Sequence, residues 1–121
     1  MLASADEFVD RVNRLQRPEG YRLIASFEEG EEQAVAAAGF RPGNQLARGF
    51  HIYIDDLSTR AAFRGRGHAG ALLDWIGAEA RRLGCRQVEL DSGVGADRQA
   101  AHRLYFNKRM RISSYHFTHE L

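Results

Sequence analysis

The stretch Arg64-Gly65-Arg66-Gly67-His68-Ala69-Gly70 places three glycines in seven residues and leads directly into the best-marked helix of the chain. Glycines at the start of a helix let backbone N–H groups approach a phosphate closely, and the helix dipole adds positive potential at the same end. The segment therefore indicates an anion-binding loop, with a purely structural turn as the alternative. It is not a Walker loop, because no Gly-Lys-Ser/Thr follows, and it lacks the full dinucleotide-binding spacing.

The helix after this loop is predicted by apolar residues that recur on one helix face, and Gly84 stands where a left-handed cap would end it. Beyond the cap, residues 87–91 predict a short strand, residues 97–108 a second helix and residues 111–117 a closing strand. The apolar positions of the long helix are Ala69, Leu72, Leu73, Ile76, Ala80 and Leu83.

Ahead of the loop, Ser4-Ala-Asp-Glu7 has the form of a capping box and opens a helix that Pro18 and Gly20 end. Residues 21–27 and 33–40 predict two strands. The segment Arg41-Pro42-Gly43-Asn44 predicts a type II turn, because proline presets the first central dihedral and glycine accepts a positive φ at the second.

A third strand begins near Phe50, where residues alternate between two faces. Three antiparallel strands followed by a strand–helix–strand crossover predict an α/β fold with a mixed central sheet flanked by helices. One face of the third strand carries Phe50, Ile52 and Ile54, and the other carries His51, Tyr53, Asp55 and Leu57.

The length of 121 residues and a hydrophobic content of 44% predict a single domain, residues 1–121, with a real core. The apolar runs are too short to span a bilayer, and the start lacks the pattern of a secretory signal, so we expect no membrane association. The single cysteine, Cys85, excludes an internal disulfide and fits a cytoplasmic location. We expect no metal site, because His102, His116 and His119 lack the i, i+4 spacing of a ligand pair on one helix.

The net charge of +1 argues against a general nucleic-acid binder. Residues 1–56 hold six basic and ten acidic residues, whereas residues 57–121 hold eleven basic and six acidic ones. The second half therefore suits an anionic ligand, although solvated surface arginines would give the same count. We interpret the acidic run of residues 28–32 as a solvated hairpin tip, with attraction of a cationic acceptor as the alternative.

The combined features resemble the GCN5-related N-acetyltransferases, the GNAT family, whose acetyl-CoA loop has the form Gln/Arg-x-x-Gly-x-Gly/Ala. Residues 64–69 fit this form, and the leucine pair usual in the next helix is present as Leu72-Leu73. Leu57-Ser58-Thr59 stands where the family's central strand ends in Leu-x-Val. Ala101-His-Arg-Leu-Tyr105 is similar to the segment whose tyrosine lies near the thioester sulfur.

The resemblance implies a GNAT-type fold and acetyl-CoA as co-substrate, with no metal. In the family the central strand splays from its neighbour, so the backbone of Leu57, Ser58 and Thr59 would bind the pantetheine arm. Residues Arg64, Gly65, Arg66, Gly67, His68, Ala69 and Gly70 would hold the pyrophosphate. Tyr105 would be the general acid that protonates the departing thiolate, with a packing role on its helix as the alternative.

The general base is open between two residues on one face of the third strand, His51 and Asp55, with Glu89 on the next strand as a third candidate. An imidazole accepts a proton near neutral pH, directly or through a water. Positioning and desolvation alone would suffice if the amine arrives neutral. A buried structural histidine and a surface carboxylate are the corresponding alternatives.

Several departures from the family qualify this picture. We expect the usual first strand to be lacking, which would expose a sheet edge that a second copy could cover, giving a homodimer. The common Gly-Phe after the tyrosine helix is Arg109-Met110 here, and Arg98 replaces a frequent asparagine. The short ending is similar to relatives that acetylate small primary amines, so we expect a small-molecule amine acceptor. The alternatives are a non-catalytic acyl-CoA-binding or regulatory module, and a dimeric scaffold with a degenerate loop.

Overall fold

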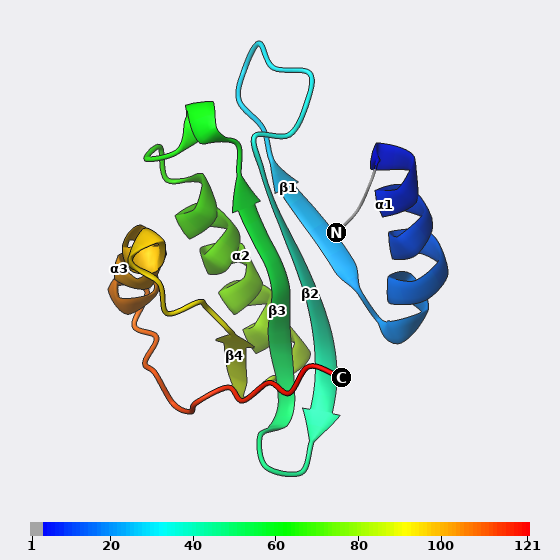
Figure 1. Cartoon of the computed structure of the whole chain (residues 1–121), viewed down its shortest axis with the longest axis vertical. Coiled ribbons are helices and arrows are strands. Elements are labelled where there is room, and N and C mark those ends of the chain that lie inside the picture. The colour runs from blue at the N-terminus through cyan, green and yellow to red at the C-terminus, as the bar shows by residue number, and fades with distance from the viewer. Residues whose placement is uncertain (1–3) are drawn as a thin grey trace. The chain divides into compact units, whose positions relative to one another are not determined.

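The computed structural model describes residues 4–121 and divides into two compact units, Met1–Leu90 and Asp91–Leu121 (Figure 1). The first unit holds a four-stranded sheet in the order β1-β2-β3-β4, formed by Arg22–Ser26, Ala36–Gln45, Gly49–Thr59 and Gln87–Leu90. β1–β2 and β2–β3 pair antiparallel, and β3–β4 pair parallel. The predicted crossover is confirmed, because helix α2, His68–Leu83, joins the two parallel strands.

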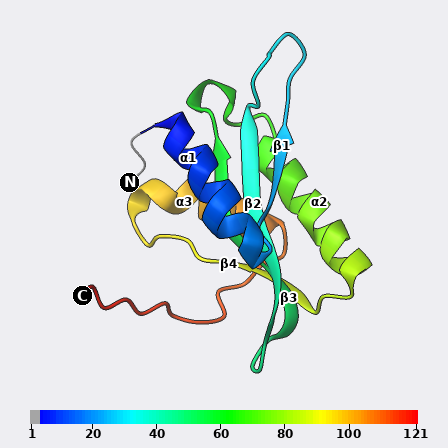
Figure 2. The ribbon, with the colours of Figure 1, turned by 90° about the vertical axis from the view of Figure 1, so that its right-hand side faces the viewer.

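α2 lies along one face of the sheet, as Figures 1 and 2 show, and its apolar stripe forms the core with that face. Phe40, Ile52 and Ile76 are fully buried, and the Phe40 ring lies 6.2 Å from that of Trp75. At the edge of this core Glu79 is buried between two arginines. Hydrogen bonds from Arg82 and Arg22 lower the pKa of its carboxyl to about 2.

The local signals at helix ends are confirmed. Ser4 Oγ accepts a hydrogen bond of 3.1 Å from the Glu7 N–H at the start of α1, Ala5–Arg11, which continues through wider and tighter turns to Glu19. Gly84 ends α2 with φ +80°, and its N–H donates to the Arg81 carbonyl at 3.1 Å. Both residues act within one turn of the chain, so local sequence suffices to identify them.

The prediction of a type II turn at residues 41–44 is wrong. These residues continue β2, and the chain turns at residues 46–48 instead. Pro42 pairs with Ile52 of β3, whereas β1 pairs with β2 only as far as Phe40. Proline is tolerated there, because this part of β2 has a neighbouring strand on one side only within the described residues.

The alternation predicted for β3 is wrong beyond a β-bulge at Asp55. Gly39 pairs with Asp56 and Phe40 pairs with Ile54, so Asp55 is an extra residue opposite β2. One added residue reverses the alternation beyond it. Leu57 pairs with Ala38, which shares the face of Phe40 covered by α2, so Leu57 lies on the face opposite to His51 and Tyr53.

The second unit contains helix α3, Gln99–Asn107, preceded by a short 3-10 turn at Ala96–Arg98. The N–H groups of Arg109 and Met110 donate to the carbonyls of Phe106 and Tyr105, each at 3.0 Å, which is a Schellman ending. Arg109 takes the left-handed position of this ending, with φ +64°. The prediction of a closing strand at residues 111–117 is wrong. This segment is exposed and pairs with no strand within residues 4–121. An alternating pattern without a hydrogen-bonded neighbour does not make a strand.

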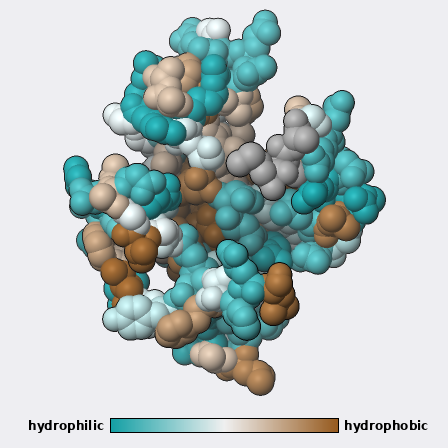
Figure 3. Space-filling view, in the orientation of Figure 1, coloured by the Kyte–Doolittle hydropathy of each residue, from teal (hydrophilic) through white to brown (hydrophobic). Residues whose placement is uncertain are grey.

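Exposed apolar side chains occur in both units, and on the face drawn in Figure 3 they form separate spots between hydrophilic residues. Scattered exposed apolar residues are normal on a protein surface. Within residues 4–121, no helix combines the length and apolarity needed to cross a bilayer.

Candidate functional site

The glycine-rich loop leaves the N-terminus of α2 without a side-chain cap. Gly67 is the N-cap residue with φ +88°, and the first helical hydrogen bond runs from the Ala71 N–H to the Gly67 carbonyl at 3.0 Å. The N–H groups of His68, Ala69 and Gly70 therefore have no acceptor within the helix. A Cβ built on Gly65 or Gly67 would meet no atom within 4 Å, so no neighbouring side chain packs against these two glycines. The arrangement suits an anion.

Two of the three basic side chains of the loop are held by Glu28, in the β1–β2 connection. Arg66 Nη1 lies 2.7 Å from Glu28 Oε2, and His68 Nε2 lies 2.9 Å from Glu28 Oε1. Ser26 Oγ contacts the other His68 nitrogen at 2.7 Å. The hydrogen bond with His68 and the charge of Arg66 lower the pKa of Glu28. The interpretation of residue 28 as part of a solvated tip is therefore wrong, because the fold brings it to the loop from 38 residues away.

Arg64 is the basic side chain of the loop with no carboxylate partner among the described residues. Its Nε donates to the Thr59 carbonyl at 3.4 Å, and the residue is exposed. Arg64 is thus the loop cation that an incoming anion reaches without displacing a carboxylate.

β3 extends beyond its neighbour β4. The β3–β4 ladder stops at the pair Ile54–Leu90, whereas β3 pairs with β2 as far as Thr59. On the side away from β2, residues 57–59 therefore have no neighbouring strand within the first unit. The role of residues 57–59 in binding a pantetheine arm stays a prediction from the resemblance.

His51 and Glu89 lie close together on neighbouring strands. His51 Nε2 is 3.9 Å from Glu89 Oε2, and the two side chains are 6% and 14% exposed. His51 Nδ1 lies 3.0 Å from the Gly49 carbonyl oxygen, and Arg48 Nε lies 2.7 Å from Glu89 Oε1. Glu89 Oε2 is buried and has no hydrogen-bond partner among the described residues.

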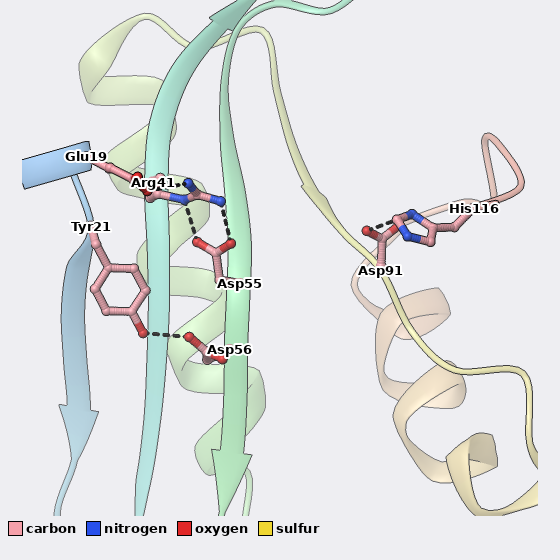
Figure 4. A network of polar contacts seen from close by, with 7 residues as sticks. All are labelled: Glu19, Tyr21, Arg41, Asp55, Asp56, Asp91 and His116. Atoms are coloured by element: carbon pink, nitrogen blue, oxygen red, sulfur yellow. Dashed lines mark hydrogen bonds and ion pairs between the residues drawn. The ribbon is translucent and has the colours of Figure 1, made fainter. Parts of the chain in front are cut away.

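Asp55, the other candidate base, is bound by Arg41. Arg41 Nε and Nη2 each donate to one Asp55 oxygen at 2.8 Å, and Arg41 Nη1 also lies 3.4 Å from Glu19 Oε2 (Figure 4). The hydrogen bonds with Asp55 raise the pKa of Arg41. Both oxygens of Asp55 are thus engaged by one guanidinium in a bidentate, charge-assisted pair. Asp55 is therefore better suited to positioning than to proton transfer.

A second polar contact beside it was missed by sequence reasoning. The Tyr21 hydroxyl donates to Asp56 Oδ2 at 2.7 Å (Figure 4). Burial, followed by the hydrogen bond to Asp56, raises the pKa of Tyr21. The contact lies beside the bulge, because Asp56 pairs with Gly39 and Tyr21 Oη lies against Gly39, and no local sequence pattern indicates such an insertion.

Tyr105, the predicted general acid, lies half-buried on α3 in the second unit. Its carbonyl accepts hydrogen bonds from Lys108 and Met110 at 3.1 and 3.0 Å. In the same unit His116 Nδ1 lies 3.4 Å from Asp91 Oδ2 (Figure 4). The role of Tyr105 stays a prediction from the resemblance.

No group of three or more His, Cys, Asp or Glu side chains within residues 4–121 is arranged to hold a metal ion. The first unit thus carries the loop residues 64–70, the end of β3 beyond β4 and the His51–Glu89 pair on one strand–helix–strand crossover, with His51 eight residues before Thr59 on β3.

Comparison with known proteins agrees with the class of protein that this fold and loop define. The model of the acetyltransferase (GNAT) family matches residues 3–110, and the chain belongs to that family. It is 34% identical over 113 residues to the uncharacterized N-acetyltransferase YhdJ of Bacillus subtilis (strain 168), covering 93% of this chain and 77% of YhdJ.

Solved structures of acetyltransferases share the fold. An acetyltransferase of Trypanosoma brucei superposes with a TM-score of 0.80 at 20% identity, over 100% of this chain and 82% of that one. The structure of AAC(6')-Iy, in complex with the bisubstrate analogue CoA-S-monomethyl-acetylneamine, superposes with a TM-score of 0.79 at 12% identity, over 98% of this chain and 81% of that one. At these identities the likeness concerns the fold alone.

Proposed function

We propose that this chain is an acetyl-CoA-dependent N-acetyltransferase that moves the acetyl group to a primary amine of a small molecule, by direct transfer in a ternary complex. The observation that carries the proposal is the uncapped N-terminus of α2 together with the end of β3 beyond β4 in a chain of the GNAT family. A small-molecule acceptor is supported by AAC(6')-Iy, whose bisubstrate analogue joins CoA to an acetylneamine group.

The residues of the loop fit the diphosphate of acetyl-CoA. The N–H groups of His68, Ala69 and Gly70 and the side chain of Arg64 bind its oxygens, while the backbone of residues 57–59 aligns the pantetheine arm. Acetyl-CoA supplies the activated thioester. His51 accepts a proton from the amine, and Tyr105 donates one to the departing thiolate.

Calorimetric titration with acetyl-CoA tests the cofactor site. The double variant Gly67→Glu, Ala69→Glu places bulk and negative charge in front of the helix N-terminus, and we expect it to lose the micromolar binding of the wild type. Ala78→Glu adds one such charge at an exposed position of the same helix about 15 Å further along, so it shows what a single distant charge contributes. Undiminished binding by the double variant, with the fold intact by circular dichroism, would contradict this cofactor site.

Turnover is tested by thiol release across a panel of small primary amines, with Tyr105→Phe as the variant. We expect the variant to bind acetyl-CoA normally and to turn over about a hundredfold more slowly, as the loss of one general acid costs. Full turnover by Tyr105→Phe would refute the acid role. Binding by the wild type without acetyl consumption for every amine would make the chain a non-catalytic acyl-CoA-binding module instead.

A further inference from the structure

One carboxylate oxygen of Glu89 is buried without a hydrogen-bond donor. Arg48 occupies Oε1 at 2.7 Å, but Oε2 has no partner among the described residues. A buried, unpartnered carboxylate oxygen is costly, and folded proteins satisfy nearly all such groups. We therefore expect Glu89 Oε2 to accept a hydrogen bond from a proton-bearing group while the protein functions.

The nearest group to this oxygen is the ring of His51. A carbonyl oxygen accepts hydrogen bonds only, so the contact of 3.0 Å with Gly49 requires the hydrogen of a neutral ring to sit on Nδ1. The lone pair is then on Nε2, which lies 3.9 Å from Glu89 Oε2. Two acceptor atoms thus lie near each other at a separation too long for a hydrogen bond. A proton on Nε2 would give the carboxylate a charged partner.

The pair lies on the strand pair that leads to the proposed thioester site. His51 pairs with Gln87 and Tyr53 pairs with Glu89, so His51 and Glu89 share the face opposite to α2. His51 is three residues, about 10 Å, before Ile54, where the pairing of β3 with β4 ends while its pairing with β2 continues.

We propose that Glu89 is a positioning residue that stabilises His51 as the proton acceptor of the transfer reaction. An N–H bond of the acceptor's ammonium breaks, its electron pair stays on the amine nitrogen, and the lone pair of His51 Nε2 takes the proton. The positive charge moves from the amine to the imidazole ring, where Glu89 Oε2 faces it, and the neutral amine is left to attack the thioester carbonyl. The proton later leaves His51 for solvent. The role rests on the proposed function.

Other charged groups surround this pair in the first unit, and Arg48 is the one that Glu89 itself holds. Arg48 holds the other Glu89 oxygen, and the Arg86 side chain lies over Gly49, where its Cδ would be 3.0 Å from an added Cβ. Tyr53 and the Arg41–Asp55 pair follow on the same face of β3. A comparison of wild type with Glu89→Gln therefore isolates one negative charge in nearly constant shape.

The test measures kcat/KM for the amine between about pH 5.5 and 9.5. The Glu89 carboxylate favours the protonated ring, so its removal lets the base form of His51 persist to lower pH. We expect the acidic limb of the Glu89→Gln profile to move down by about one pH unit or more, with the KM for acetyl-CoA unchanged. Glu89→Asp retains the charge and should restore most of the wild-type profile. Asp10→Asn removes another arginine-paired carboxylate, on α1, and should leave the limb in place.

The titration of the His51 ring, followed by nitrogen NMR in the same proteins, separates this proposal from the proposed function. The expected result is the same downward shift in Glu89→Gln, with Nδ1 protonated throughout. An unchanged ring titration, or a kcat/KM limb that does not move, would overturn the role of Glu89 even with turnover present. A wild type that binds acetyl-CoA but acetylates no amine would overturn the proposed function, and the catalytic part of this proposal with it, whatever the ring titration shows.

Discussion

Gly39 of β2 lies directly against Tyr21, so no larger residue can replace this glycine without a rearrangement. A Cβ at position 39 would lie 1.5 Å from Tyr21 Oη and 2.1 Å from Cζ, far inside van der Waals contact. The Tyr21 ring is buried, so it must shift and loosen its hydrogen bond to Asp56. Overpacking costs about 1–3 kcal/mol, and a hydrogen bond to a charged acceptor contributes about 1.5–3 kcal/mol. We expect Gly39→Ala to lower the free energy of unfolding by about 3 kcal/mol.

Urea denaturation measures this loss as a midpoint lower by about 1.5 M for a typical slope of 2 kcal/mol per M. Gly43→Ala is the matched control, because Gly43 lies in the same strand and an added Cβ there meets nothing within 4 Å. It should change stability by less than about 1 kcal/mol. Tyr21→Ala should lower the free energy of unfolding clearly less in the Gly39→Ala background than in the wild type. Costs that add within about 0.5 kcal/mol would refute the contact as the cause.

Three further perturbations test single features of the structure. Glu28→Gln frees Arg66 and His68, so calorimetry should find acetyl-CoA bound about twofold to fivefold more tightly; weaker binding would show that Glu28 aligns these cations. The two arginine partners of Glu79 lower its pKa from 4.5 to about 2, so the stability that its charge contributes is present above about pH 4.5 and is lost as the pH falls toward 2. The difference in unfolding free energy between wild type and Glu79→Gln, measured in urea, should therefore shrink between pH 7 and pH 3. A constant difference would contradict this. Arg109→Gly relieves a positive φ of +64° and should stabilise the protein by about 1 kcal/mol in the same assay; a loss of stability would show that the arginine side chain has a role of its own.

Features that depend on neighbouring residues were predictable from the sequence. The Ser4 cap, the Gly84 cap and the apolar stripe of α2 each follow from chemistry within a few turns of one helix. The parallel crossover follows in turn, because a strand, a long helix and a second strand leave few alternatives. The glycine-rich loop belongs to the same group, since its spacing directly reflects the need for an uncapped helix start.

Features that depend on pairing were not predictable. The type II turn assigned to residues 41–44 satisfied the local rules, but pairing with β3 extends β2 through Pro42. The bulge at Asp55 reversed the face of Leu57, and its cause lies in the register between two strands. The strand expected at residues 111–117 had suitable residues but no ladder. In the first two cases the deciding contact is with a strand that is distant in sequence. In the third, no strand lies beside the segment within the described residues.

The charges of the glycine-rich loop also depend on distant residues, and they bear on how the loop would bind an anion. By sequence the loop presents Arg64, Arg66 and His68 to a ligand, yet the fold gives the last two to Glu28. An anion that used these side chains would have to compete with an internal carboxylate, so their net contribution to affinity is small. The N–H groups at the start of α2 have no such competitor within the helix. Binding should therefore depend chiefly on the backbone geometry that the glycines permit, and the loop's positive charge should act mainly through Arg64.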